Sequence, residues 1–176
     1  MAESFEKSGD IAGAEALFSR ALKKPQFKKS KKVWAAYHQF KIRTGDVSGA
    51  KEQLNRSLQS LSRHKHVFVI QKYAISEFDF GSADRGRVLF EELLNTYPKR
   101  SDLWHLYVDK ELKLGNISQA RRLFERMIAV KKSSQKNMKL VFKKYLQFES
   151  EHGTPALQEL VKQKAREYVS SYLSAK

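Results

Sequence analysis

The chain has 176 residues, of which 41% are hydrophobic, and it contains no cysteine. This length and composition suffice for one substantial core, so intrinsic disorder is not expected, and the lack of cysteine excludes disulfides and thiolate metal sites. No long apolar stretch and no basic-then-apolar leader is present, so we expect neither a membrane span nor a secretory signal. The formal charge of +15, from 34 basic and 19 acidic residues, favours a polyanionic partner. A solvated surface that only maintains solubility is the alternative.

A glycine that is followed by a helix-capping residue recurs at intervals of 34 to 38 residues. Glycine can adopt the left-handed backbone that ends one helix, and the next side chain can accept from the free N–H groups that begin another. A fixed period of this length is typical of helical-repeat proteins. The pattern predicts five helix–turn–helix corners: Gly9-Asp10, Gly45-Asp46, Gly81-Ser82, Gly115-Asn116 and Gly153-Thr154.

The apolar spacing around these corners predicts two helices per repeat, helix A before each glycine and helix B after it. In chain order, we expect B at 11–23, A at 31–44, B at 47–61, A at 64–80, B at 83–97, A at 102–114, B at 117–131, A at 137–152 and B at 156–173. The predicted fold class is all-α: a right-handed α-α superhelix, or helical-pair solenoid, of about 4.5 repeats.

The whole chain, 1–176, is predicted to form a single repeat domain. It comprises a half repeat at 1–23 and repeats at about 31–61, 64–98, 102–132 and 137–173. The half repeat predicts that the chain is a fragment of a longer protein. In the last helix Gln158 and Lys162 replace the small and aromatic residues of the other B helices, and a helical stack needs a polar helix at its end. We therefore expect a C-terminal fragment.

The predicted core consists of large side chains that recur at fixed distances from the glycines. Aromatic residues on helix A and a Phe on helix B fall on the faces that would pack together. For this reason we interpret the aromatic residues as core and not as base-stacking platforms. The predicted core residues are Trp34, Tyr37, Tyr73, Phe90, Trp104, Tyr107, Phe124 and Tyr145.

The third full repeat carries a recognisable consensus. Its helix A reads Trp104-x-x-Tyr107-x-x-x-Glu111, and its helix B reads Ala120-Arg121-x-x-Phe124-Glu125-Arg126-x-Ile128. Both resemble the half-a-TPR (HAT) repeat, in which an aromatic pair and a Glu mark the first helix and an Ala-Arg…Phe-Glu-Arg run marks the second. Glu77 and Glu149 repeat the acidic position, where we expect bonds within the repeat, whereas Lys41 departs from it.

Two longer stretches are more specific than the repeat consensus. The segments Tyr-Pro-Lys-Arg-Ser-Asp-Leu-Trp at 97–104 and Phe-Lys-Lys-Tyr-Leu…Glu…His-Gly-Thr at 142–154 resemble the C-terminal HAT module of the multi-S1-domain ribosomal RNA processing family, the programmed cell death protein 11 family. The resemblance implies a nucleolar, non-catalytic scaffold of the small-subunit processome, or 90S pre-ribosome. Its implied partners are pre-ribosomal RNA, other assembly factors and S1 domains of the same longer chain. A HAT scaffold of pre-mRNA splicing or 3′-end cleavage that acts only by protein docking is the alternative.

The basic residues gather in the connections that lead from helix B to the next helix A. The connections 20–32, 56–66, 97–102 and 131–139 together carry +15, whereas the A-to-B corners 41–46, 78–84, 110–116 and 149–154 carry −2. The candidate phosphate-binding residues form two clusters: Arg20, Lys23, Lys24, Lys28, Lys29, Lys31 and Lys32, and then Lys131, Lys132, Lys136, Lys139, Lys143 and Lys144. Lysine and arginine in such runs contact phosphates, which position RNA without specifying its sequence. A nuclear localisation signal and a solvated loop are the alternatives for 20–32.

No pattern of residues predicts catalysis. Neither a glycine-rich phosphate loop, a His-x-x-x-His pair nor a Gly-x-Ser-x-Gly elbow occurs. His64 and His66 flank Lys65 without Cys or carboxylate partners, a spacing more typical of a loop than of a zinc site. We expect no enzyme activity, no cofactor, no metal, no small-molecule substrate and no membrane partner.

Overall fold

The structure is a computed structural model, and it describes residues 9–130 and 134–174. These residues form helices and turns, and no strand occurs among them. The chain divides into two compact units, unit 1 (Met1–Thr96) and unit 2 (Tyr97–Lys176), and each is described by itself. Within each unit consecutive helices pair and stack, which confirms the predicted all-α, helical-repeat fold class.

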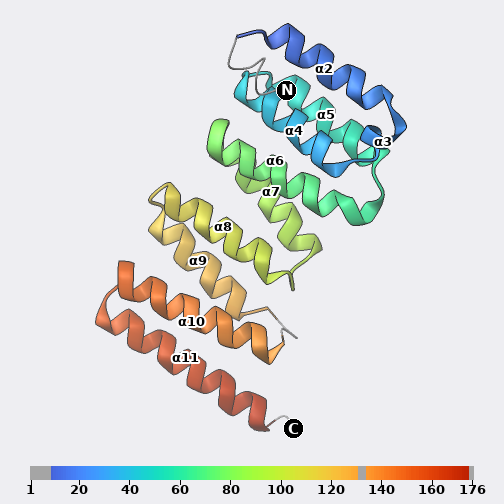
Figure 1. Cartoon of the computed structure of the whole chain (residues 1–176). Helices are drawn as coiled ribbons and strands as arrows, with labels where there is room; N and C mark the ends of the chain where they lie inside the picture. Colours follow the sequence, from blue (N-terminus) through green and yellow to red (C-terminus); the bar gives the residue numbers. More distant parts are fainter. Residues whose placement is uncertain (1–8, 131–133, 175–176) are drawn as a thin grey trace. The chain divides into compact units, whose positions relative to one another are not determined.

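The described part of unit 1 contains a B helix followed by two helical pairs (Figure 1). Helix α4 packs on both α5 and α6, and α6 packs on α7. The elements are α2 (Ile11–Lys23), α3 (Pro25–Lys28), α4 (Lys31–Arg43), α5 (Val47–Ser60), the 3₁₀ turn η1 (Arg63–Lys65), α6 (His66–Phe80) and α7 (Ala83–Thr96).

Unit 2 contains two further helical pairs. Helix α8 packs on α9, α9 on α10, and α10 on α11. The elements are α8 (Ser101–Lys113), α9 (Ile117–Ile128), α10 (Gln135–His152) and α11 (Pro155–Ser174). Among the described residues of α11 only Val161 is fully buried, which fits the polar character predicted for the last helix.

The helix bounds agree closely with the predicted ranges, and the differences lie in the B-to-A connections. The connection after α2 contains the short helix α3, and the connection after α5 contains η1; neither is predicted. Proline opens α3 at its first position, where the missing N–H removes no intrahelical bond. The connection 20–32 is therefore largely helical.

The predicted core residues are all buried, with exposed fractions between 0 and 5%. The two tryptophans also hold the backbone that precedes them. The indole Nε1–H of Trp34 donates to the carbonyl oxygen of Lys28, and that of Trp104 to the carbonyl oxygen of Pro98, each at 2.8 Å and six residues back along the chain. A buried indole N–H needs an acceptor, and here that acceptor lies in the B-to-A connection.

The corner glycines form two classes, which the sequence pattern does not distinguish. Gly9, Gly45 and Gly115 have φ between 75° and 78°, as predicted. Gly81 and Gly153 have φ of −120° and −111°, so the prediction of left-handed backbone is wrong at these two corners. There the A helix continues to the residue before the glycine, and an added Cβ would collide with the carboxylate of the Glu four residues earlier. Glycine is needed at these corners for close approach.

The predicted helix caps are largely present. Asp10 accepts from the N–H of Gly13 at 2.8 Å, and Asp46 accepts from that of Gly49 at the same distance. Asn116 does not accept such a bond, so its predicted capping role is wrong. Its side-chain amide instead donates to Oε2 of Glu111 at 2.8 Å, because that buried carboxylate requires a donor.

The residue four positions before each later corner glycine is charged and buried: Lys41, Glu77, Glu111 and Glu149. Three of these side chains contact the residue after the glycine. Lys41 Nζ donates to Asp46 Oδ2 at 2.8 Å, Glu111 accepts from Asn116, and Glu77 Oε2 accepts from the backbone N–H of Ser82 at 3.0 Å. Glu149 instead bonds to Arg121 of the preceding repeat. This position therefore joins helix A to its surroundings, whichever sign of charge it carries.

Candidate nucleic-acid interface

The first basic cluster, residues 20–32 of unit 1, covers the end of α2, all of α3 and the start of α4. Arg20 and Lys23 lie in the last turn of α2, and Lys28 lies in the last turn of α3. All seven basic side chains are exposed except that of Lys31, which is half-buried with its ammonium 4.4 Å from the ring centroid of Phe68. Helix α3 and the hydrogen bond from Trp34 to the Lys28 carbonyl oxygen fix the backbone that carries these charges.

The basic side chains of this cluster form no ion pair with any acidic residue in the described part of the chain. No acidic residue occurs between Ala16 and Gly45, which explains the missing partners. Uncompensated cations at a protein surface attract polyanions and release counterions on binding. This cluster is therefore the strongest candidate phosphate-binding surface in unit 1.

The second B-to-A connection of unit 1 adjoins the first. The ammonium of Lys65, in η1, donates to the carbonyl oxygen of Lys29 at 2.8 Å. The two connections therefore lie side by side at one end of the unit, where Figure 1 shows α3 beside the turn between α5 and α6. The repeat thus brings together cations that are 36 residues apart in the chain.

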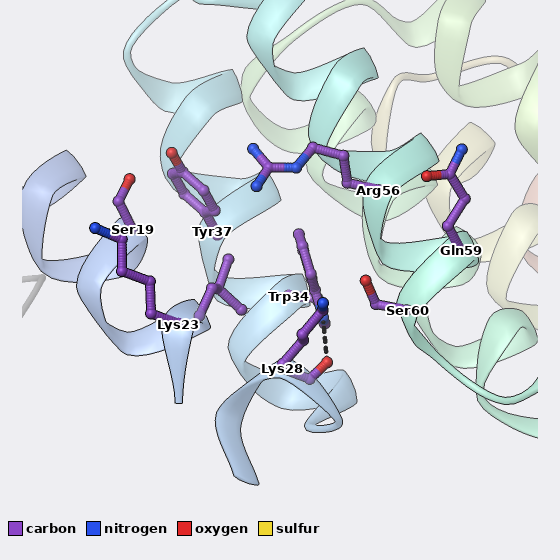
Figure 2. Close-up of a pocket in the computed structure, with 9 residues that line it drawn as sticks. Ser19, Lys23, Lys28, Trp34, Tyr37, Arg56, Gln59 and Ser60 are labelled. Atoms are coloured by element: carbon purple, nitrogen blue, oxygen red, sulfur yellow. Dashed lines mark hydrogen bonds between the residues drawn. The ribbon is translucent and has the colours of Figure 1, made fainter. Parts of the chain in front are cut away.

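A hollow of about 490 Å³ opens beside the basic cluster, between α2, α4 and α5 (Figure 2). Three cationic side chains reach it, Lys23, Lys28 and Arg56, and Figure 2 shows the Arg56 guanidinium extended from α5 towards Tyr37. Its other lining residues are Ser19, Leu22, Trp34, Tyr37, Gln59 and Ser60. No acidic residue lines the hollow among the residues that the structure describes.

Two carboxylates lie close to the hollow, and both already have cationic partners. Glu15 is paired with the buried Lys41 and also accepts from the hydroxyl of Tyr37 at 3.3 Å. Burial raises the pKa of Tyr37, so its hydroxyl stays protonated. Glu52 lies 4.0 Å from Arg56 in an exposed i, i+4 pair, a kind of contact worth only about 0.3–0.5 kcal/mol. Arg56 can therefore exchange this partner for a ligand.

The described lysines of the second basic cluster, in unit 2, lie at different places along α10. Lys131 and Lys132 lie outside the described residues. Lys136 and Lys139, near the start of α10, line a hollow of about 560 Å³ together with Phe142, Tyr168 and Tyr172. Its remaining lining residues are Gln135, Ala165 and Val169.

The later lysines of this cluster lie further along α10. Lys143 is exposed, and Lys144 lines another hollow that also contains Asp109 and Glu151. Both lie within α10, where the predicted helix at 137–152 also places them. Because acidic side chains share the surroundings of Lys144, its charge is more compensated than the charges of residues 20–32.

No group of three or more His, Cys, Asp or Glu side chains that could hold a metal ion occurs among the described residues. His66 Nε2 lies 2.8 Å from the carbonyl oxygen of Leu61, which gives this ring a structural partner in the backbone. No helix in the described part of the chain combines the length and the apolar character that crossing a bilayer requires.

Comparison with known proteins identifies relatives over nearly the whole chain. It is 38% identical to the protein RRP5 homolog of Mus musculus over 175 residues, which covers 99% of this chain and 9% of the relative. It is 42% identical to the rRNA biogenesis protein rrp5 of Schizosaccharomyces pombe over 164 residues, which covers 93% of this chain and 10% of the relative. The chain thus spans about a tenth of the length of these proteins.

More distant likenesses are also found. The pre-mRNA-splicing factor clf-1 of Neurospora crassa is 28% identical over 162 residues, which covers 89% of this chain and 23% of that protein. A solved structure of a MamA mutant aligns over 94% of this chain and 92% of its own, at 18% identity and a TM-score of 0.44, which is too remote to support an argument. No family model matches the chain.

Proposed function

We propose that this chain, which belongs to the RRP5 family of rRNA biogenesis proteins, is a non-catalytic scaffold module that docks proteins and pre-ribosomal RNA during assembly of the small ribosomal subunit. Its place of action would be the nucleolus. Its partners would be pre-rRNA, other assembly factors and the S1 domains of a longer chain. Membership of the RRP5 family supports a role in rRNA biogenesis. The stacked helical pairs support the scaffold role, because such stacks present extended binding surfaces.

The observation that carries the RNA part of the proposal is the uncompensated charge of residues 20–32 in unit 1. These cations occupy one short path, adjoin Lys65 of the next connection and lack acidic partners among the described residues. A solvated loop that only maintains solubility would not need this alignment across two repeats. Because the cluster offers charge and few base-reading groups, the contact would be with the phosphate backbone and independent of sequence.

The test is a charge reversal that removes phosphate contacts and no packing. Lys24, Lys29 and Lys32 are exposed and do not line the hollow, so K24E/K29E/K32E should leave the fold unchanged. Affinity for single-stranded RNA should fall. The slope of log K against log salt should flatten by about 2 units, since each phosphate contact contributes about 0.7.

The matched control is K51E/K113E/R122E, which makes the same charge change at exposed residues near A-to-B corners. Lys41 is unsuitable as a control, because it is buried and ion-paired. Equal loss of RNA in both variants would show that the charge acts diffusely and would contradict the proposed surface.

A second candidate function is a scaffold that acts purely by protein docking, as a module of splicing or 3′-end processing. The likeness to the splicing factor favours it, although that likeness is weaker than the one to the RRP5 proteins. A chain that binds no RNA in the experiment above, and that co-purifies with spliceosomal proteins and not with pre-ribosomal particles, would establish this alternative.

A further inference from the structure

The hollow between α2, α4 and α5 has features that binding to a surface phosphate does not require. It draws its lining from three helices, it is enclosed on two sides by α2 and α5, and its volume of about 490 Å³ falls in the range of small-molecule sites. Arg56 belongs to a helix that the basic cluster of residues 20–32 does not include. The hollow is therefore a concave extension of the basic surface.

The lining combines charge with neutral hydrogen-bonding groups. Lys23 of α2, Lys28 of α3 and Arg56 of α5 all line the hollow, and Figure 2 shows the Ser60 hydroxyl and the Gln59 amide further along α5 than Arg56. An arginine fork can grip two oxygens of one phosphate, which a lysine cannot. Hydroxyl and amide groups can both donate to and accept from a sugar hydroxyl.

The aromatic rings at the hollow are not available for stacking on a base. Trp34 and Tyr37 are each 2% exposed, and the Tyr37 ring stacks on Phe18 with 4.7 Å between centroids. The two rings therefore only shape the surface of the hollow. The groups that can recognise a ligand are the cations and the polar side chains of Ser19, Gln59 and Ser60. These groups can bind the phosphate and the ribose of a nucleotide and leave its base without a stacking partner.

We infer that this hollow binds the phosphate and ribose of one nucleotide within a single-stranded RNA that runs along the basic cluster of residues 20–32. The inference rests on the proposed RNA-binding function and specifies its site and its ligand. A nucleic acid is favoured over an acidic peptide because Gln59 and Ser60 lie beside the cations and can bond the hydroxyl of a sugar, which an acidic peptide does not have. A ribose is favoured over a deoxyribose because Gln59 and Ser60 offer partners for a 2′-hydroxyl.

The side chain of Trp34 provides a direct reporter. The chain has two tryptophans, Trp34 at the hollow and Trp104 in unit 2, and so two indole N–H resonances. Titration of the isotopically labelled chain with oligouridine should shift the Trp34 resonance, and the Trp104 resonance should move less. Oligodeoxyuridine and oligoglutamate of equal charge are the comparison ligands, and both should bind more weakly.

The variant that isolates the hollow is Arg56→Ala, with Lys51→Ala on the same helix as its matched control. Both residues are exposed, so unchanged indole resonances of the free variants should confirm an intact fold. R56A should weaken oligouridine binding about tenfold, the loss expected for a hydrogen bond to a charged group, and K51A should change it little. Gln59→Ala should lower the preference for oligouridine over oligodeoxyuridine.

The outcomes separate the two proposals. If K24E/K29E/K32E loses RNA while R56A does not, and Trp34 stays unshifted, the hollow is not the site but the basic cluster still binds RNA. If the deoxy ligand binds equally well, the ribose contact is wrong. If oligoglutamate binds more tightly than oligouridine, the hollow is a peptide site and the inference fails. If no RNA binds the unmodified chain, both proposals fail together.

Discussion

At one junction between repeats in each unit, the same pair of structural positions carries opposite charges. In unit 1, Lys41 of helix A is buried and pairs with Glu15 of the preceding B helix. In unit 2, Glu149 of helix A is buried and pairs with Arg121 of the preceding B helix through bonds of 2.6 and 3.0 Å. Both pairs join one repeat to the next. At these two junctions complementary charge joins the repeats, whichever helix carries the positive side chain.

Each pair is adapted to the corner beside it. Asp46, after Gly45, gives Lys41 a second carboxylate, whereas Thr154, after Gly153, is neutral and adds no charge beside Glu149. Burial opposes the charge on Lys41, but bonds to Asp46 and Glu15 outweigh it and raise the pKa of Lys41. The same contact with Lys41 lowers the pKa of Asp46. Reversing the charges at the unit 1 junction therefore requires changes at three residues, Lys41, Glu15 and Asp46.

The largest effect should come from Lys41→Glu in unit 1. This change brings a third carboxylate beside Glu15 and Asp46, and a broken buried pair typically costs about 3–5 kcal/mol, reduced here because Glu15 and Asp46 are each about 40% exposed. We expect a loss of about 3 kcal/mol in the free energy of unfolding, measured by urea denaturation. Adding Glu15→Arg and Asp46→Thr should recover most of it. No recovery in the triple variant would contradict the equivalence of the two junctions.

The next effect concerns pH and His38, a second difference between the units. Seven residues before the corner glycine unit 1 has His38 and Ala74, whereas unit 2 has Val108 and Leu146. His38 is fully buried between the rings of Trp34 and Tyr73, and its ring nitrogens have no partner among the described residues. Burial lowers its pKa to about 4. Histidine in unfolded chains titrates near 6.5.

Between pH 6.5 and 4 the unfolded state therefore takes up a proton at His38 that the folded state does not. Stability should fall with decreasing pH across this window, by about 3 kcal/mol at its lower end, and His38 should add no pH dependence above it. His38→Leu should remove this component, measured as the difference between the two stability–pH curves. Parallel curves for the two proteins would show that His38 is solvated.

The smallest effect should come from Glu149→Gln in unit 2. The amide keeps the shape and one acceptor, so the variant loses charge complementarity with Arg121 but little packing. We expect a loss of about 1–3 kcal/mol, since hydrogen bonds to charged groups contribute about this much. Hydrogen exchange should localise the loss to α9 and α10. Unchanged protection in these helices would indicate that the pair contributes no stability.

Local and repeated features could be predicted from the sequence. The glycines, the aromatic spacing and Pro155 each act within one or two turns, so they locate the helices within a few residues and identify Trp34 and Trp104 as core. The two classes of corner could not be predicted. Gly81 and Gly45 are each followed by a capping residue, and only the structure shows that Gly81 has a negative φ and lies where an added Cβ would collide with the Glu77 carboxylate.

Much of the candidate site depends on tertiary contacts. The basic cluster at 20–32 is visible as a run in the sequence, but Arg56, Gln59 and Ser60 belong to a separate helix and show no motif. A weak signal for Arg56 exists, because it is the first basic residue of the next B-to-A connection. Lys41 looks like a departure from the HAT consensus, and its meaning appears only when Glu15, 26 residues earlier, is seen beside it.

RNA crosslinking of the intact chain, followed by identification of the crosslinked peptides, tests the central claim most directly. If the basic cluster of residues 20–32 and the adjoining hollow bind RNA, crosslinks should concentrate in peptides covering 19–34 and 56–65, and excess salt should abolish them. The corners at 41–46 and 78–84 should remain free of crosslinks. Crosslinks spread evenly over both units, or confined to α8–α11, would contradict the account.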